Sequence, residues 1–338
     1  MVRRPTRSLA ALVAVAVLST TMLSCGGGDD ELVIYSGRAK NLVSPLLERF
    51  SEETGIAIAV KYADTAELAL LIEQEGDQPE ADVFLSQSPG ALGYLAGVDR
   101  LAALPGTVLE DVDERFRSSE GLWVGTSGRV RTLVYNTDLV DDTDLPGSVF
   151  ELTEPRYAGQ LGVAPTNGSF QDFVTVMRAS TGDDETLAWL EGLVANGSRT
   201  YANNTAILQA VSRGEVPFGL VNHYYNERQL AEDPSSPTEN HFFEGDLGSI
   251  VLTTGVGVVA GTDRAEEAER FVRFLLSEEA QRFFSQETFE YPLANDVEPV
   301  ADLVPLGTID VPRVDLNELG GGLQRTQELI ESSGLERS

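Results

Sequence analysis

The chain has 338 residues, of which 42% are hydrophobic and 7% aromatic, a composition typical of a packed globular protein rather than a disordered one. Acidic residues outnumber basic residues by 54 to 24, and the formal net charge of -30 excludes nucleic acid as a partner, because little positive charge is available to neutralise phosphates. The acidic residues are spread along the whole chain, so we interpret them as a solvating surface rather than as a means of attracting cations.

The N-terminal segment has the pattern of a bacterial lipoprotein signal. Three arginines within the first seven residues precede the apolar run 9–18, which is long enough for a secretion signal and too short to span a bilayer. Cys25 follows where such a signal places its acylated residue. We predict a signal peptide over 1–24, then a lipidated Cys25 and a flexible Gly-rich tether over 25–30. The protein is therefore expected outside the cytoplasm, anchored in the membrane by lipid, with no other cysteine for disulfides or soft metals.

Strand and helix patterns alternate in the first half of the remaining chain. Apolar residues recur with strand or helix spacing in this order: strand 32–35, helix 41–54, strand 56–62, helix 66–75, strand 82–85 and helix 89–96. A β-α-β-α-β order predicts a parallel sheet with right-handed crossovers. The fold class is therefore α/β.

The second half continues the alternation. Further strands are predicted at 130–135, 161–164, 218–221 and 250–259, and further helices at 170–180, 185–195, 205–213 and 265–276. No segment after the signal is long and apolar enough to span a membrane. A mature chain of roughly 310 residues is too long for one ordinary core and suits two lobes.

Two adjacent tyrosines, Tyr224 and Tyr225, follow the predicted strand 218–221 almost directly. In an open α/β sheet, ligands bind where strands end. Two phenols beside Asn222 and His223 make a hard oxygen-donor site, which suits a highly charged cation, above all Fe³⁺, whose charge would drive the phenols to phenolates despite their ordinary pKa of about 10. The alternative is that one ring packs in the core while the other lies on the surface.

The segment Thr-Asn-Gly-Ser at 166–169 lies between a predicted strand and a predicted helix. Free backbone N–H groups and the partial positive charge of a helix start make such a turn a ready anion site. Turns of this composition are common, so the pattern alone is a weak signal.

Several short stretches, in this order and spacing, carry a resemblance to a known family: 33–38, 75–77, 81–84, 127–131, 203–204, 214–217, 222–225 and 290–293. On these stretches the chain resembles the ferric-ion-binding substrate proteins of bacterial ABC importers, over essentially all of its mature length. The resemblance implies a type II periplasmic-binding-protein fold, in which two lobes joined by a two-strand hinge enclose a ligand cleft.

We expect the chain to cross between the lobes near Arg129 and again near Val251. The expected boundaries are 31–128 plus 253–300 for lobe 1, and 129–252 plus 301–338 for lobe 2.

The resemblance implies that Tyr224 and Tyr225 are phenolate ligands of Fe³⁺. Family members often add a histidine where this chain has Ala39 and a glutamate where it has Gln87, and another branch adds a tyrosine where it has Phe170. Two phenolates leave the ion short of charge and donors, so we expect carbonate, phosphate or a citrate-like anion to complete the shell.

Further ligands are proposed with alternatives. Tyr62, at the end of a strand, is a candidate third phenolate or a packing residue, and Gln87 offers a neutral oxygen that is weaker than a carboxylate. The resemblance places the anion near Gly168, Ser169, Asn204 and Asn222, and the turn pattern adds Asn167. Three arginines add charge there or form structural pairs: Arg38, Arg129 and Arg131.

Catalysis is not expected. A hydrolase needs a nucleophile and a base, and a zinc enzyme needs His or Cys ligands, yet the chain has two histidines, no Gly-x-Ser-x-Gly motif and no free cysteine. His223 is expected to pack near the tyrosines rather than bind metal. We predict a monomeric binding protein that delivers ferric iron to an ABC permease. The alternative is the same fold with a phosphonate, sulfate, thiamine or polyamine as cargo.

Overall fold

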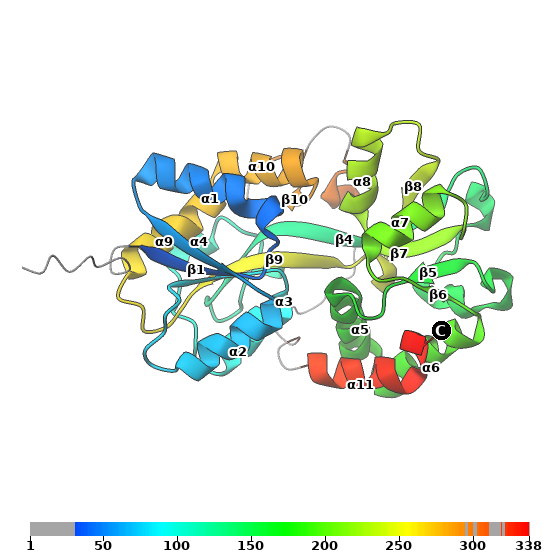
Figure 1. Ribbon diagram of the computed structural model, residues 1–338, viewed down its shortest axis with the longest axis horizontal. Coiled ribbons are helices and arrows are strands. Elements are labelled where there is room, and N and C mark those ends of the chain that lie inside the picture. The colour runs from blue at the N-terminus through cyan, green and yellow to red at the C-terminus, as the bar shows by residue number, and fades with distance from the viewer. Residues whose placement is uncertain (1–30, 295–296, 300–302, 311–318, 320–321, 338) are drawn as a thin grey trace, which may run out of the picture. The chain divides into compact units, whose positions relative to one another are not determined.

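The computed structural model describes residues 31–294, 297–299, 303–310, 319 and 322–337 (Figure 1). The predicted signal peptide, Cys25 and the tether lie outside the described residues. Within them, no helix combines the length and apolar character needed to cross a membrane.

The described residues form mixed α/β structure, as predicted. The strands are β1 (Leu32–Ser36), β2 (Ile58–Tyr62), β3 (Val83–Ser86), β4 (Val124–Asn136), β5 (Leu161–Val163), β6 (Arg199–Thr200), β7 (Phe218–Asn222), β8 (Thr238–His241), β9 (Val251–Val258) and β10 (Tyr291–Pro292). The helices are α1 (Lys40–Thr54), α2 (Thr65–Glu75), α3 (Pro89–Gly97), α4 (Gly106–Leu109), α5 (Gly168–Thr181), α6 (Asp183–Ala195), α7 (Asn204–Ser212), α8 (His223–Glu232), α9 (Ala265–Leu275), α10 (Glu278–Thr288) and α11 (Leu323–Ser333).

The strands follow the order β2-β1-β3-β9-β4-β7-β5-β6, and β8 and β10 also pair with β4. β1 runs parallel to β2 and β3, as the β-α-β-α-β order predicted, and β5 runs parallel to β6 and β7. β4 and β9 run antiparallel to each other, so the sheet is mixed.

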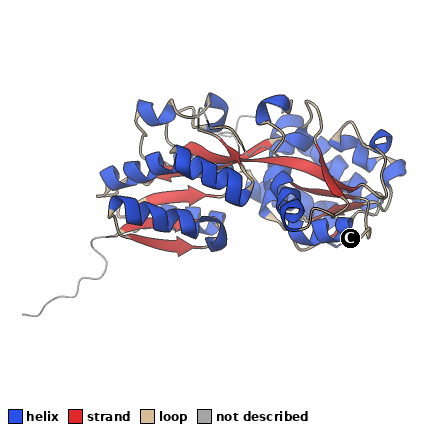
Figure 2. Cartoon of the chain, turned by 90° about the horizontal axis from the view of Figure 1, so that it is seen from above, coloured by secondary structure: helices blue, strands red, loops and turns tan. Residues whose placement is uncertain are grey.

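β4 joins two groups of strands. The first group is β1, β2, β3 and β9, and the second group is β5, β6, β7 and β8. Its residues 124–130 pair with β9, while its residues 131–136 pair with β7 and β8. Figure 2 shows a long strand that runs from one side of the molecule to the other. In this register Ser86, the last residue of β3, pairs with Gly255 of β9, and Asn222, the last residue of β7, pairs with Arg131. Because Gly255 pairs with Gly125 of β4, the carboxyl ends of β3 and β7 point towards each other from opposite ends of the stretch 125–131 of β4.

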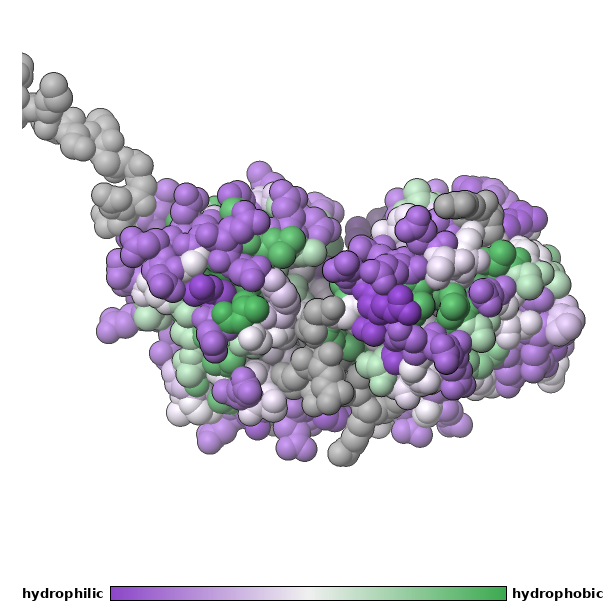
Figure 3. All heavy atoms as spheres, turned by 90° about the horizontal axis from the view of Figure 1, so that it is seen from below, coloured by the Kyte–Doolittle hydropathy of each residue, from purple (hydrophilic) through white to green (hydrophobic). Residues whose placement is uncertain are grey.

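Helices cover both sides of the first group, with α1 and α10 on one side and α2 and α3 on the other (Figure 1). Phe50 of α1 packs against Phe271 and Phe274 of α9, with ring centroids 5.0 and 5.4 Å apart. In the second group α5, α6 and α11 pack together. The face shown in Figure 3 is mostly hydrophilic, with small apolar patches, as expected of a solvating surface.

Candidate metal and anion site

The tyrosine pair lies where a strand passes directly into a helix. β7 ends at Asn222 and α8 begins at His223, so Tyr224 and Tyr225 fall in the first turn of α8. Their rings stack with centroids 4.3 Å apart and planes 28° apart. Tyr224 is buried and Tyr225 half-buried. The predicted position at the carboxyl end of the strand is thus confirmed.

The phenol of Tyr224 is held in its neutral form. Burial raises the pKa of Tyr224 well above 10, and neighbouring Tyr225 raises it further, while the charge of Arg129 acts in the opposite direction. A cation bound at the oxygen would replace the proton and reverse the preference.

Arg131 is buried and holds polar groups around it. Its Nη1 donates to Asn222 Oδ1 at 3.2 Å and to Ser169 Oγ at 3.4 Å, and its Nη2 donates to the carbonyl of Leu220 at 3.0 Å. Burial lowers the pKa of Arg131 to about 9. This value is still above neutral pH, so the guanidinium remains charged. It therefore supplies positive charge beside the tyrosines.

The polar residues predicted for the anion meet at this arginine. Asn167 caps α5 by accepting from the backbone N–H of Ser169 at 3.2 Å, and Ser169 Oγ donates to Asn167 Oδ1 at 2.6 Å. Asn204 Nδ2 donates to Ser169 Oγ at 3.0 Å. Arg131, predicted either to add charge or to form a structural pair, lies at the centre of these contacts. The anion cluster is defined as Asn167, Gly168, Ser169, Asn204 and Asn222 around Arg131.

The anion cluster has unused polar atoms. Arg131 Nε, Asn204 Oδ1 and Asn222 Nδ2 are buried and find no hydrogen-bond partner among the described residues. Unpaired buried polar groups cost free energy, so a ligand that pairs with them binds favourably. Gly168 opens α5, is exposed and has open space where a Cβ would stand, which leaves the helix N-terminus accessible.

Arg129 connects the turn after β3 to the same region. Its Nη2 donates to the backbone carbonyl of Gln87. The Gln87 side-chain Oε1 is buried without a hydrogen-bond partner among the described residues. The side chain of Gln87 therefore has an unpaired oxygen within the described part of the chain, although its contact with Arg129 is made by the backbone.

Arg38 forms a buried ion pair instead of facing the anion cluster. Its Nη1 lies 3.0 Å from Glu290 Oε2, with both side chains fully buried, and donates to Thr254 Oγ1 at 2.7 Å. This contact ties the end of β1 to β9 and to the segment before β10. It supports the structural alternative given for this arginine.

Tyr62 ends β2, the edge strand, which is four places from β4 in the sheet. Its ring is half-buried against the hydrophobic core. Phe170, which stands where a family branch has tyrosine, is fully buried and packs on Phe173 and Trp189. Both positions fit packing better than metal binding.

Both ring nitrogens of His223 are occupied. Nδ1 accepts from the backbone N–H of Val130 at 3.1 Å, and Nε2 donates to the carbonyl of Phe289 at 2.9 Å. Burial lowers the pKa of His223 to about 4. The imidazole is therefore neutral and has no nitrogen free for a metal, in agreement with its expected packing role.

Asp172 is the residue of this region that the sequence analysis missed. Its Oδ1 accepts from Ser88 Oγ at 2.8 Å. Removal from water raises the pKa of Asp172 to about 6, although the hydrogen bond from Ser88 and the charges of Arg129 and Arg131 act in the opposite direction. Its spacing of four residues from Gly168 puts it on the same face of α5, and this spacing is the signal that could have identified it.

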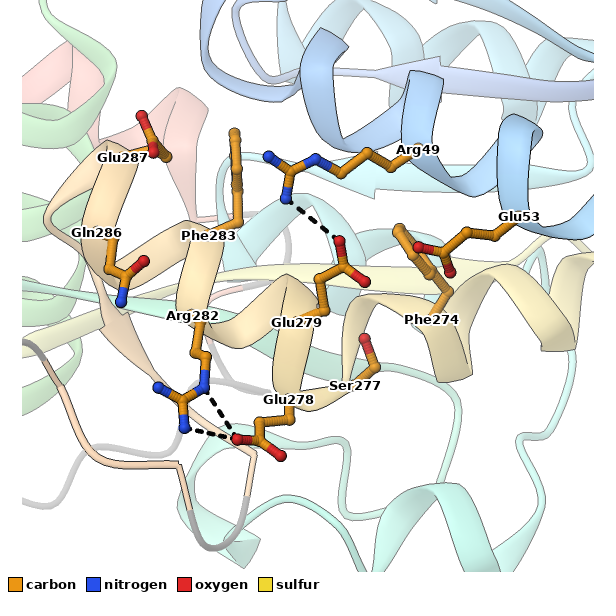
Figure 4. A pocket seen from close by; sticks show the side chains of 10 residues that line it. All are labelled: Arg49, Glu53, Phe274, Ser277, Glu278, Glu279, Arg282, Phe283, Gln286 and Glu287. Atoms are coloured by element: carbon orange, nitrogen blue, oxygen red, sulfur yellow. Dashed lines mark hydrogen bonds and ion pairs between the residues drawn. The ribbon is translucent and has the colours of Figure 1, made fainter.

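A second surface feature lies elsewhere. Figure 4 shows a pocket of about 610 Å³ between α1 and α10. Its arginines are engaged by acidic neighbours, since Arg49 pairs with Glu279 at 3.3 Å and Arg282 with Glu278 at 2.6 Å. None of the predicted site residues lines it. Among the described residues, no group of three or more His, Cys, Asp or Glu side chains is placed to hold a metal.

Comparison with known proteins gives consistent results. Residues 78–308 match the family model described as bacterial extracellular solute-binding protein. The chain is 29% identical over 336 residues to the "Fe(3+)-binding periplasmic protein" of Serratia marcescens, an alignment that covers 97% of this chain and 98% of the relative. It is 32% identical to "Iron uptake protein A1" of Synechocystis, with 98% of both chains covered.

Solved structures share the fold. The iron-bound form of HitA from Pseudomonas aeruginosa superimposes with a TM-score of 0.84 and 31% identity, covering 90% of this chain and 99% of that protein.

His223 generates a prediction about acid stability. Its pKa is about 4 in the folded protein and near 6.5 in the unfolded chain, so the unfolded chain binds more protons between these pH values. The free energy of unfolding should fall as the pH falls through this window, by up to roughly 3 kcal/mol from this residue. His223→Gln keeps an acceptor and a donor without titrating, so urea unfolding of the iron-free variant should show a weaker pH dependence.

The matched control is His241→Gln, whose parent imidazole also has a lowered pKa but is only half-buried. Its effect on the pH dependence should be smaller. If the free energy of unfolding of His223→Gln and of the parent falls equally as the pH is lowered, His223 is not the residue responsible for this pH dependence.

Proposed function

Because the chain belongs to the family of bacterial extracellular solute-binding proteins, we propose that its cargo is ferric iron, which it captures outside the cytoplasm and delivers to an ABC permease. The resemblance identified from the sequence is confirmed by this family match, and the periplasmic-binding-protein fold by the solved structures. The observation that carries the proposal is the stacked pair Tyr224 and Tyr225 beside the anion cluster.

We propose that both phenols bind the metal as phenolates. Phenolate oxygens are hard donors, which match Fe³⁺ better than softer divalent ions. Burial keeps Tyr224 protonated until a strong cation arrives, so binding of weakly charged ions is disfavoured. The site thereby selects for high charge.

Charge balance supports an added anion. Two phenolates cancel two of the three charges of the ion, and Arg129 and Arg131 add positive charge nearby. The unused donors Arg131 Nε and Asn222 Nδ2, together with the N-terminus of α5, are suited to an oxyanion. Carbonate, phosphate and a citrate-like chelator all have this chemistry. A Trichodesmium protein of this fold was solved with iron and citrate. It superimposes with a TM-score of 0.79 and 26% identity, covering 90% of this chain and 99% of that one.

Fewer contacts support the further metal ligands considered beside the tyrosine pair. Gln87 contributes a neutral oxygen from the turn after β3, since its Oε1 is buried and unpaired among the described residues. The core packing of Tyr62 argues against a third phenolate from that position.

We also propose the lobes and their hinge. Lobe 1 comprises 31–128 plus 253–300, and lobe 2 comprises 129–252 plus 301–338. The pairing of β4 with β9 on one side and with β7 on the other supports crossings near Arg129 and Val251. Closure of the lobes around iron would present one surface to the permease.

An anionic organic solute is the second candidate. The anion cluster would hold the phosphonate or sulfate group, and the tyrosine rings would pack against the rest of the solute. The visible spectrum separates the two, because ferric phenolates absorb visible light and complexes of such solutes do not. In either case we propose binding without catalysis, by a monomer held at the membrane through Cys25.

The first test removes one phenol oxygen. Tyr225→Phe should abolish or strongly shift the visible band of the ferric complex and weaken iron binding by more than about 100-fold, since even residues that only support a metal ligand are worth about 10- to 100-fold. Tyr157→Phe, whose hydroxyl donates to the carbonyl of Asp144 away from the site, is the control and should keep the parental band. A Tyr225→Phe protein that keeps the visible band and the parental affinity for ferric iron would contradict the proposal.

The second test addresses the anion. Removing carbonate, phosphate and citrate from the buffer should bleach or shift the band, because phenolates fill only two of about six positions on the ion. Gln87→Glu should reduce this dependence by adding a charged oxygen. If iron binding is indifferent to all three anions, side chains of the protein complete the shell and the open-shell model is wrong.

The third test concerns the anchor. Cys25→Ala should move the protein from the membrane fraction to the soluble fraction and leave ferric binding unchanged, because the acylated cysteine and the tyrosine pair are separate parts of the chain. Mass spectrometry of the parent should find Cys25 acylated, and an unmodified Cys25 in the mature protein would contradict a lipoprotein.

A further inference from the structure

The turn between β3 and α3 contacts residues that are distant in sequence. Ser88 Oγ donates to Asp172 Oδ1 at 2.8 Å, and Arg129 Nη2 donates to the carbonyl of Gln87. β3 belongs to the group of strands around β1, whereas α5 follows β5 in the other group. The Ser88–Asp172 contact therefore bridges the two groups of strands.

The turn itself is well defined. Ser86 Oγ donates to the carbonyl of Ser88 at 2.7 Å and accepts from the Ser88 N–H at 3.2 Å. Ser88 Oγ also accepts from the backbone N–H of Gly90 at 3.3 Å, which caps α3. Gln87 lies between Ser86 and Ser88, so it belongs to the same hydrogen-bonded turn.

Asp172 lies on α5, the helix that also carries Ser169 of the anion cluster. It lies within electrostatic range of Arg129 and Arg131, and Arg131 holds Ser169 and Asn222. α5 thus carries both Asp172, which accepts from Ser88, and Ser169, which accepts from Arg131 at the centre of the anion cluster. The Oδ1 of Asp172 accepts from a hydroxyl group, and such a bond to a charged group is stronger than one between neutral groups.

We propose that the hydrogen bond between Ser88 and Asp172 is a clasp that closes the turn after β3 onto α5 and sets how long the cargo stays bound. The part that concerns cargo rests on the proposed function. The part that concerns closure rests on the proposed lobes and on the contact between Ser88 and Asp172, but not on the identity of the cargo. The two residues are positioning residues rather than ligands.

The clasp predicts faster release of cargo. Ser88→Ala and Asp172→Ala should each release Fe³⁺ to a competing chelator on the order of tenfold faster than the parent, a factor within the range of one hydrogen bond to a charged group. The visible band should keep its wavelength, because the ligands are unchanged. Ser88→Thr retains a hydroxyl group and should restore the parental rate.

A double-mutant cycle separates the clasp from other roles of the two residues. Ser88 also caps α3, whereas Asp172→Ala leaves that cap intact. If the residues act through each other, the double variant should release iron no faster than the faster single variant. The matched control is Ser235→Ala, which removes an exposed hydrogen bond of 2.6 Å to Asp233 elsewhere and should leave the release rate unchanged. Fully additive effects of Ser88→Ala and Asp172→Ala would overturn the clasp.

A distance measurement on iron-free protein tests the closure itself. Spin labels at exposed Glu67→Cys of α2 and Glu185→Cys of α6, in a Cys25→Ser chain, report the distance between the two groups of strands. Ser88→Ala should lengthen or broaden the distance distribution, and an unchanged distribution would refute the clasp. A parent that fails to bind ferric iron would refute the proposed function instead, and this measurement would still decide the closure.

Discussion

Two guanidinium groups buried in the middle of β4, those of Arg129 and Arg131, are the constraint around which the site is arranged. A buried cation costs free energy unless acceptors and opposite charges surround it. Arg129 therefore draws the turn at Gln87 towards β4, and Arg131 gathers Ser169 and the end of β7. This positive charge is the reason an anion is proposed here, and the charge of Arg129 also favours loss of the Tyr224 proton.

The parts of the fold that depend on local pattern were predictable from the sequence. The alternation of strands and helices, the parallel pairing of β1 with β2 and β3, and the end of a strand just before the tyrosine pair were predicted and are observed. β4 begins at Val124, earlier than the predicted 130, because its first half is rich in Gly and Ser and lacks an apolar alternation. Pairing with β9 and β10 makes it a strand, so tertiary context overrides propensity.

The candidate site was predictable only where turn chemistry or resemblance pointed to it. The turn 166–169 was predicted to lie at a helix start, and α5 begins there with Asn167 as its cap. The Arg38–Glu290 pair and the Ser88–Asp172 contact join residues far apart in the chain, so no local pattern reports them. In the sequence such charged residues are indistinguishable from solvated surface ones, and only the tertiary structure shows which are buried.

The imidazole of His223 makes the strand that joins the two groups and the helix that carries the phenols one mechanical unit. Val130, the last residue of β4 that pairs with β9, donates its N–H to this ring, and the ring in turn holds the carbonyl of Phe289. The ring therefore couples β4 at Val130 to the first turn of α8. If the proposed hinge bends there, the two phenol oxygens would shift with the strand, so that opening of the proposed lobes and disturbance of the proposed metal site would be one movement.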